Sequence, residues 1–123
     1  MKFLLPQGRG RQAESLACRY LEKQGLDLIE KNYSCRLGEV DLIMQDGESL
    51  VFIEVKYRNN DLYGHASEAV GRRKQAKVIK TALHYLQTHH RYREWPMRFD
   101  VVTIEGEAGK DIQWLSNAFM AEY

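Results

Sequence analysis

Glu39, Asp41, Glu54 and Lys56 are the residues of this chain whose types and spacing best suit metal-dependent chemistry. Carboxylates are hard oxygen ligands, and Mg²⁺ is commonly held by one or two of them while water and substrate phosphate complete its shell. A lysine beside such an ion could orient a water molecule or hold a phosphate oxygen. These residues therefore point to hydrolysis at a phosphate group.

The stretch from Gly38 to Lys56 predicts a β-hairpin, because Asp46-Gly47 is a strong turn signal and alternating apolar residues flank it. A loop of two or four residues would place Asp41 opposite Phe52 and diagonal to Glu54, within reach of one shared ion. A loop of three residues would move the acids to different faces. The predicted register also pairs Ile43 with Leu50 and Glu39 with Glu54, and it places Val40, Leu42 and Met44 together on the opposite face.

A divalent cation would resolve an electrostatic conflict on this face. Like charges across a ladder are destabilising, and partly buried carboxylates raise the pKa of one another. The same face carries Leu50 and Phe52, which favours burial. The alternative interpretation is an ordinary solvated hairpin face, since charged side chains usually lie at the surface. The stretch alone favours neither.

A helix of about 15 residues ending at Gly25 is predicted before the hairpin, with residues 1–9 as a flexible lead-in and residues 26–35 as a strand. Its apolar stripe consists of Ala13, Leu16, Ala17, Tyr20, Leu21 and Gln24. Glu14 lies on the shoulder of that stripe. It is either a first-turn acid favoured by the helix dipole or a further acid of the site.

A second helix is predicted from an N-cap at Ser67 to about His89, after a loop at residues 59–66. His65 in that loop is either a solvated side chain or a substrate contact. The apolar stripe expected to dock on the sheet is Gln75, Ala76, Ile79, Ala82, Leu83 and Leu86. Beside it runs a basic stripe of Arg73, Lys77, Lys80 and His84, with Lys74 adding charge.

The charge distribution favours a nucleic-acid partner although the net charge is only +1. Residues 71–94 are strongly basic, whereas the acids gather in the hairpin and near the C-terminus. Separate basic and acidic regions are what a phosphate-backbone binder with an acidic metal site needs. We therefore expect Arg73, Lys74, Lys77 and Lys80 to contact nucleic acid, although a basic helix face can also be plain solvated surface.

Residues 97–105 and 112–119 predict two closing strands. Asp100 is either another carboxylate of the site or, as the preferred interpretation, a structural acid paired with Arg98 or a backbone amide. Both faces of the central strands carry apolar residues, so the chain predicts an α/β fold with a mixed sheet covered on both faces. At 123 residues it should form a single domain, residues 1–123. Cys18 and Cys35 have no metal-ligand spacing, and reduced thiols in the cytoplasm are the simplest interpretation. We expect neither a signal peptide nor a membrane span.

Asp41, twelve intervening residues and Glu54-Val55-Lys56 resemble the core motif of the restriction-endonuclease-like, or PD-(D/E)xK, nuclease superfamily. One departure is Val40, where that motif has proline. From about Gly10 to Phe119 the chain resembles the YraN-like family of small bacterial proteins predicted to be endonucleases. That resemblance rests on five blocks in order: Ala13-Glu14, Gly38–Ile43, Phe52–Lys56, Glu68-Ala69-Val70 with Lys74-Gln75, and Arg98–Val102.

The resemblance implies a three-layer α/β/α sandwich with a central mixed sheet of about five strands. It implies that Asp41 and Glu54 bind Mg²⁺, or Mn²⁺ in its place, together with the Val55 carbonyl and with Glu14 through water. Glu39 is a lesser metal candidate. Lys56 would position the attacking water or stabilise negative charge, and Gln75 would orient the substrate.

The leading hypothesis is therefore a cytoplasmic, metal-dependent endonuclease that hydrolyses DNA. The chain is also similar to the archaeal Holliday-junction resolvases, which suggests branched DNA as substrate, and two coordinated cuts would require a homodimer. One rival is a nucleic-acid-binding protein that keeps the nuclease fold without catalysis. Another is a protein–protein adaptor in which the acids form a docking patch.

Overall fold

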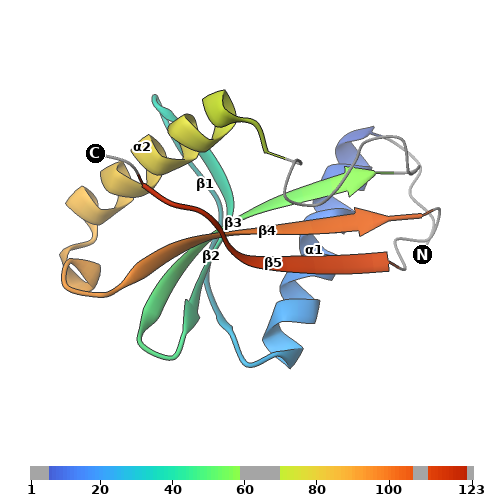
Figure 1. The fold of residues 1–123 in the computed structure, drawn as a ribbon, viewed down its shortest axis with the longest axis horizontal. Helices are drawn as coiled ribbons and strands as arrows, with labels where there is room; N and C mark the ends of the chain where they lie inside the picture. Colours follow the sequence, from blue (N-terminus) through green and yellow to red (C-terminus); the bar gives the residue numbers. More distant parts are fainter. Residues whose placement is uncertain (1–5, 59–69, 107–110, 122–123) are drawn as a thin grey trace.

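The computed structural model describes residues 6–58, 70–106 and 111–121, and it shows an α/β fold built on one five-stranded mixed sheet (Figure 1). The strand order follows the chain, and only the β3–β4 pair is parallel. A parallel pair needs a crossover, and here the crossover carries α2. The elements are α1 Pro6–Lys23, β1 Asp27–Cys35, β2 Gly38–Asp46, β3 Ser49–Arg58, α2 Arg72–Thr88, a 3₁₀ turn His90–Tyr92, β4 Met97–Glu105 and β5 Asp111–Phe119.

Helix α1 begins earlier than the sequence suggested. It starts at Pro6, so residues 6–9 are helical and do not belong to a flexible lead-in. Proline is tolerated in the first turn, because the N–H that it lacks has no partner there. The helix ends before Gly25, whose φ of 104° suits a helix C-terminus.

The β2–β3 hairpin closes with a two-residue loop, Gly47-Glu48, so the predicted register is wrong by one residue on each strand. Ile43 pairs with Phe52 instead of Leu50. Gly47, with φ of 61°, takes the first loop position, where a Gly-X turn needs a positive φ. The parity is unchanged, and Ile43, Leu50 and Phe52 still share a face, as predicted.

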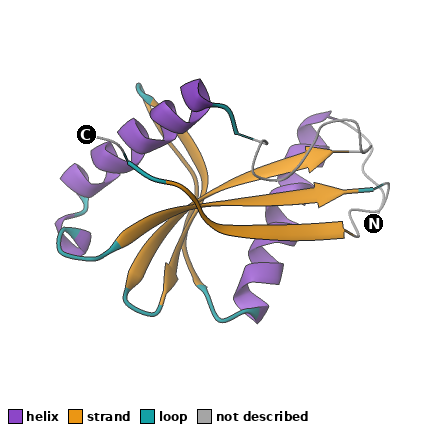
Figure 2. Cartoon of the chain, viewed as in Figure 1, coloured by secondary structure: helices purple, strands orange, loops and turns teal. Residues whose placement is uncertain are grey.

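Two cores lie on different sides of the sheet, one under each helix (Figure 2). Neighbouring strand residues point to opposite faces, so each strand supplies both cores. The α1-side core consists of Ala13, Ala17, Cys18, Leu21, Leu26, Leu42, Met44, Val51, Ile53, Val102 and Ile104. The α2-side core consists of Val40, Ile43, Leu50, Phe52, Val70, Val78, Ala82, Tyr85, Tyr92, Phe99, Val101 and Phe119.

The stripe that helix α2 presents to the sheet matches the predicted one only in part, because Ala82 is buried and Ile79 and Leu86 pack against the core. Its buried residues are Val78, Thr81, Ala82 and Tyr85, whereas Gln75, Ile79, Leu83 and Leu86 are half-buried and Ala76 is exposed. The aromatic ring of Tyr85 decides the orientation, because it meets Phe52, Tyr33 and Tyr92 in the core. The helix starts at Arg72 with Gly71 as N-cap. The predicted N-cap Ser67, the loop at residues 59–66 and His65 lie outside the described residues.

Asp100 in β4 is a structural acid, as predicted. It is fully buried and accepts hydrogen bonds from the Arg98 guanidinium, the indole N–H of Trp114 at 2.9 Å and the backbone N–H of Asn117 at 2.8 Å. These contacts hold the irregular end of β5 against β4, where the register shifts between Phe99 and Val101.

Candidate active site

Asp41 lies where β2 and β3 separate. The last regular pair between these strands is Leu42 with Ile53. Beyond it, the backbone N–H of Val55 donates to Oδ2 of Asp41 at 2.8 Å. Strand N–H groups point in the plane of the sheet toward the neighbouring strand. The Asp41 carboxylate therefore occupies the place of a β2 backbone acceptor, and the register continued by one residue sets it opposite Glu54 instead of diagonal to it.

The alternation of side chains in β2 breaks at this point. Val40 packs in the α2-side core with Ile43, whereas Leu42 packs in the α1-side core. The expectation that Val40 and Leu42 share a face is therefore wrong. In the neighbouring strand, Asn32 has a positive φ of 54° between the pairs Lys31–Leu42 and Tyr33–Val40. The side chains of both strands therefore switch faces at this step, and the Asp41 side chain lies between the two faces of the sheet.

Glu54 is the deepest acid of the site, on β3 and on the α2 side. Its side chain is buried, and burial together with the Asp41 carboxylate raises its pKa to about 9. Lys74 of α2 and Lys56 of β3 act in the opposite direction. The ammonium of Lys74 lies 3.5 Å from Oε1 of Glu54, which is long for a hydrogen bond. Within the described part of the chain, this buried Oε1 has no hydrogen-bond partner.

Glu14 approaches the same place from α1. Burial and the nearby carboxylates of Asp41 and Glu39 raise its pKa, while a hydrogen bond with the Asn32 side chain lowers it. Because α1 begins at Pro6, Glu14 lies two turns inside the helix, and the first turn carries no acid. The helix-dipole interpretation of Glu14 is therefore wrong. Glu14 of α1 and Glu54 of β3 both interact with Asp41 of β2, and we call these three residues the acid cluster.

The remaining predicted residues divide between this acid cluster and the surface around it. Lys56 is half-buried beside Glu54, and Lys74, expected as a nucleic-acid contact, is paired with that acid. Gln75 uses its Nε2 to donate to the carbonyl of Val70 at 2.8 Å, which fixes the entry into α2. The other predicted nucleic-acid contacts are exposed on α2, namely Arg73, Lys77 and Lys80.

A pocket of about 390 Å³ lies between α2 and the turn that joins β1 to β2, and Glu39 is the acid that lines it. Lys74 and Lys77 form one wall, and the end of β1 and the start of β2 form the other, with Ser34, Cys35, Gly38 and Glu39. Gly38 has φ of 150°, and a Cβ there would lie 2.9 Å from Oγ1 of Thr81. Only glycine allows this turn to approach α2 so closely.

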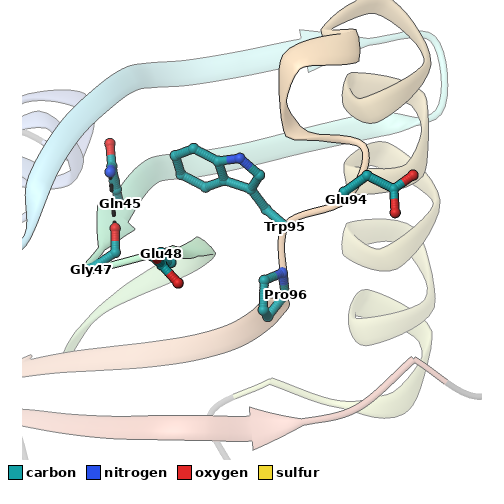
Figure 3. A pocket seen from close by; sticks show the side chains of 6 residues that line it. All are labelled: Gln45, Gly47, Glu48, Glu94, Trp95 and Pro96. Atoms are coloured by element: carbon teal, nitrogen blue, oxygen red, sulfur yellow. Dashed lines mark hydrogen bonds between the residues drawn. The ribbon is translucent and has the colours of Figure 1, made fainter.

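A second pocket, of about 270 Å³, lies at the opposite end of the β2–β3 hairpin (Figure 3). Trp95 and Pro96 face the turn residues across it, and Glu48 and Glu94 stand at its edge. Its lining holds two carboxylates and no basic side chain, so it is a poor place for a phosphate group.

The donor set of the first site fits a small divalent cation bound largely through water. Among the described residues, no group of three or more His, Cys, Asp and Glu side chains is arranged to hold a metal ion directly. Asp41 and Glu54 are neighbouring acids, and within the described ranges of the chain the buried Oε1 of Glu54 accepts no hydrogen bond and faces only the Lys74 ammonium. One or two carboxylates are what Mg²⁺ usually takes. The Val55 carbonyl points to the same edge of β3 as its N–H, so it also faces the gap.

Sequence reasoning missed two features of the site. The charge of Lys74 matches the basic stripe and predicts a surface position, and no sequence pattern distinguishes a lysine paired with a buried acid from a solvated one. Asn32 was treated as an ordinary strand residue. The available signal was its type, since asparagine enters the left-handed region more readily than other residues with a side chain.

Comparisons with known proteins place similar chains in several bacteria. The family described as "Uncharacterised protein family UPF0102" matches residues 13–104. A UPF0102 protein of Nitrosococcus oceani is 51% identical over 123 residues, covering 99% of each chain. One from Stutzerimonas stutzeri is 51% identical over 92% of this chain and 95% of its own. One from Legionella pneumophila (strain Corby) is 45% identical over 95% of this chain and 98% of its own.

None of the described helices is both long and apolar enough to span a bilayer.

Proposed function

The chain belongs to the family UPF0102, and with that premise we propose that it is a metal-dependent endonuclease that hydrolyses phosphodiester bonds in DNA. The observation that carries the proposal is the buried Glu54 beside Asp41 at the gap between β2 and β3, with an Oε1 that accepts no hydrogen bond from any described residue and has only the Lys74 ammonium near it at 3.5 Å. A buried carboxylate beside a second carboxylate is costly unless a cation or a proton neutralises it. A pair of acids such as Asp41 and Glu54 is retained more readily where it binds a cation.

In this proposal Asp41 and Glu54 hold Mg²⁺ or Mn²⁺, helped by the Val55 carbonyl and by Glu14 through water. The bound ion supplies Lewis acidity and lowers the pKa of a water molecule. Lys56 orients the attacking water or stabilises the charge that develops on the phosphate. The water oxygen bonds to phosphorus, the bond to the leaving oxygen breaks, and the products are a phosphate monoester and a free hydroxyl.

The substrate backbone would lie along α2. Lys77 lines the pocket with Lys74, which pairs with Glu54, and Arg73 and Lys80 are exposed on the same helix. Basic residues beside an acidic centre would hold the flanking phosphates while the scissile phosphate meets the ion. The basic face of α2 does not itself distinguish branched from linear DNA. The proposal of branched DNA as substrate, and of a homodimer that cuts it, rests on the resemblance to junction resolvases.

One observation favours a second candidate, a nucleic-acid-binding protein without catalysis. The ammonium of Lys74 already lies 3.5 Å from Glu54 and favours the charged form of that acid without a metal. A binder of this kind would show salt-dependent affinity for DNA and no metal-dependent cleavage.

The test is cleavage of linear, flapped and four-way DNA in the presence of Mg²⁺ or Mn²⁺. We expect wild type to cut at least one of these substrates, and Asp41→Asn and Glu54→Gln to lose the activity. Glu48→Gln is the matched control, because Glu48 is an exposed acid at the far end of the same hairpin. Equal cleavage by all four proteins would show that the acids are misassigned. Binding without cleavage by wild type would favour the second candidate.

A further inference from the structure

Asn32 has an unusual backbone conformation for the interior of a strand. It is one of two residues other than glycine with positive φ in the described parts of the chain, with φ of 54°, and Asn117 is the other. The left-handed region costs most residues about 1–2 kcal/mol, and asparagine less. Such outliers persist where the surroundings require them, and they gather at functional sites. Asn32 therefore calls for an explanation in terms of its neighbours.

The backbone of Asn32 sits opposite Asp41. The flanking pairs are Lys31 with Leu42 and Tyr33 with Val40, so the position between them faces Asp41 across the ladder. Leu42 belongs to the α1-side core and Val40 to the α2-side core. The left-handed residue therefore stands at the step where both strands change face, which is the step that turns the Asp41 carboxylate toward Val55.

The side chain of Asn32 meets the other acid of the site. Its neighbour Tyr33 packs edge-on against Tyr85 of α2 at 4.9 Å between ring centroids and bonds to His84 at 2.7 Å. The Asn32 side chain itself lies on the α1 side, close to Glu14, and hydrogen bonding with it lowers the pKa of the Glu14 carboxyl.

Asn117 shows what the same conformation does elsewhere. Its φ is 56°, and its backbone N–H donates to the buried Asp100 at 2.8 Å. The hydrogen bond to Asp100 is sufficient to explain the conformation of Asn117. Asn117 lies in β5, which β4 separates from the acid cluster. Asn32 differs because both its backbone and its side chain act on candidate site acids.

We infer that Asn32 is a positioning residue of the candidate metal centre: its left-handed backbone sets Asp41 in the gap between the strands, and its carboxamide holds Glu14 toward Asp41. The inference rests on the proposed function and adds a residue to it. Partners of this outer kind typically contribute about 10–100-fold to metal affinity or activity.

The test separates the two roles by substituting glycine, which keeps positive φ at no steric cost and removes only the carboxamide. Mn²⁺ affinity is measured in solution without DNA, by the signal of free Mn²⁺ in electron paramagnetic resonance, for wild type, Asn32→Gly and Asn117→Gly. We expect Asn32→Gly to bind Mn²⁺ about 10-fold more weakly. Asn117→Gly, the matched control, should bind as wild type does. Melting temperatures verify that both variants are folded.

Glu14→Gln and the double variant then show whether Asn32 acts through Glu14. If it does, Asn32→Gly should change Mn²⁺ affinity little further in the Glu14→Gln background, because the interaction is already lost. An undiminished effect in that background, or wild-type affinity in Asn32→Gly itself, would overturn the inference while leaving the proposed function in place. A wild-type protein that neither binds Mn²⁺ nor cleaves DNA would overturn both.

Discussion

Glu54 should make the metal-free protein lose stability as the pH rises, and Glu54→Gln should remove that loss. Burial and Asp41 raise its pKa from 4.5 to about 9 in the folded chain. In the unfolded chain the carboxyl ionises near its ordinary pKa. The stabilisation from the protonated group is therefore complete below about pH 4.5 and is lost progressively up to about pH 9.

The magnitude follows from this window. Each pH unit inside it costs about 1.4 kcal/mol, so the three units from about pH 5 to about pH 8 remove about 4 kcal/mol of the free energy of unfolding. That is a large share of the roughly 5–15 kcal/mol that stabilises a typical domain. Glutamine has nearly the same shape and does not ionise. Glu54→Gln should consequently be the more stable protein at about pH 8, and the two proteins should converge toward pH 5.

The assay is urea unfolding of wild type, Glu54→Gln and Glu48→Gln with a chelator present, at both pH values. The quantity of interest is the difference between wild type and each variant, because groups distant from Glu54 titrate equally in both proteins. Glu48→Gln should follow wild type, since Glu48 is exposed. Parallel pH profiles for wild type and Glu54→Gln would refute the claim that Glu54 is held uncharged in the fold.

Three further predictions concern the metal, the turn and the basic helix. Millimolar Mn²⁺ should raise the melting temperature more at about pH 8 than at about pH 5, because metal and proton compete for the same carboxylates; an equal rise would place the ion elsewhere. Gly38→Ala should destabilise the fold by about 1–3 kcal/mol in urea unfolding, since φ is 150° and Thr81 Oγ1 would lie 2.9 Å from the new carbon. Gly10→Ala, with open space around it, should not destabilise. Lys77→Gln should weaken DNA binding in a fluorescence titration and reduce the salt slope by about one, whereas Lys23→Gln at the end of α1 should not.

The sequence predicted the elements and the sheet well where local patterns decide them. The five strands and two helices follow from periodicity, glycine and turn residues, and the parity of the hairpin loop kept Ile43 and Phe52 on one face. The register itself could not be fixed, because Asp46-Gly47 and Gly47-Glu48 are both acceptable two-residue loops. The orientation of α2 was predicted only in part, since the packing of Tyr85 against Phe52 is a tertiary effect.

The acid cluster was anticipated in membership and not in geometry. Spacing alone brings Asp41 and Glu54 to neighbouring strands. Asp41 lies between the two faces of the sheet because the β2–β3 ladder ends at Leu42 and because Asn32 has a positive φ. Both features depend on contacts between strands. The pairing of Lys74 with Glu54 joins residues 20 positions apart through the docking of α2, which no local pattern encodes.

The most direct test of the metal centre is a crystal structure of the protein soaked in Mn²⁺, with anomalous diffraction measured to locate the ion. We predict one peak bound by carboxylate oxygens of Asp41 and Glu54 beside the Val55 carbonyl, with Lys74 displaced from Glu54. A peak bound by other residues, or no peak with Lys74 still paired to Glu54, would contradict the metal site on which the proposed nuclease depends.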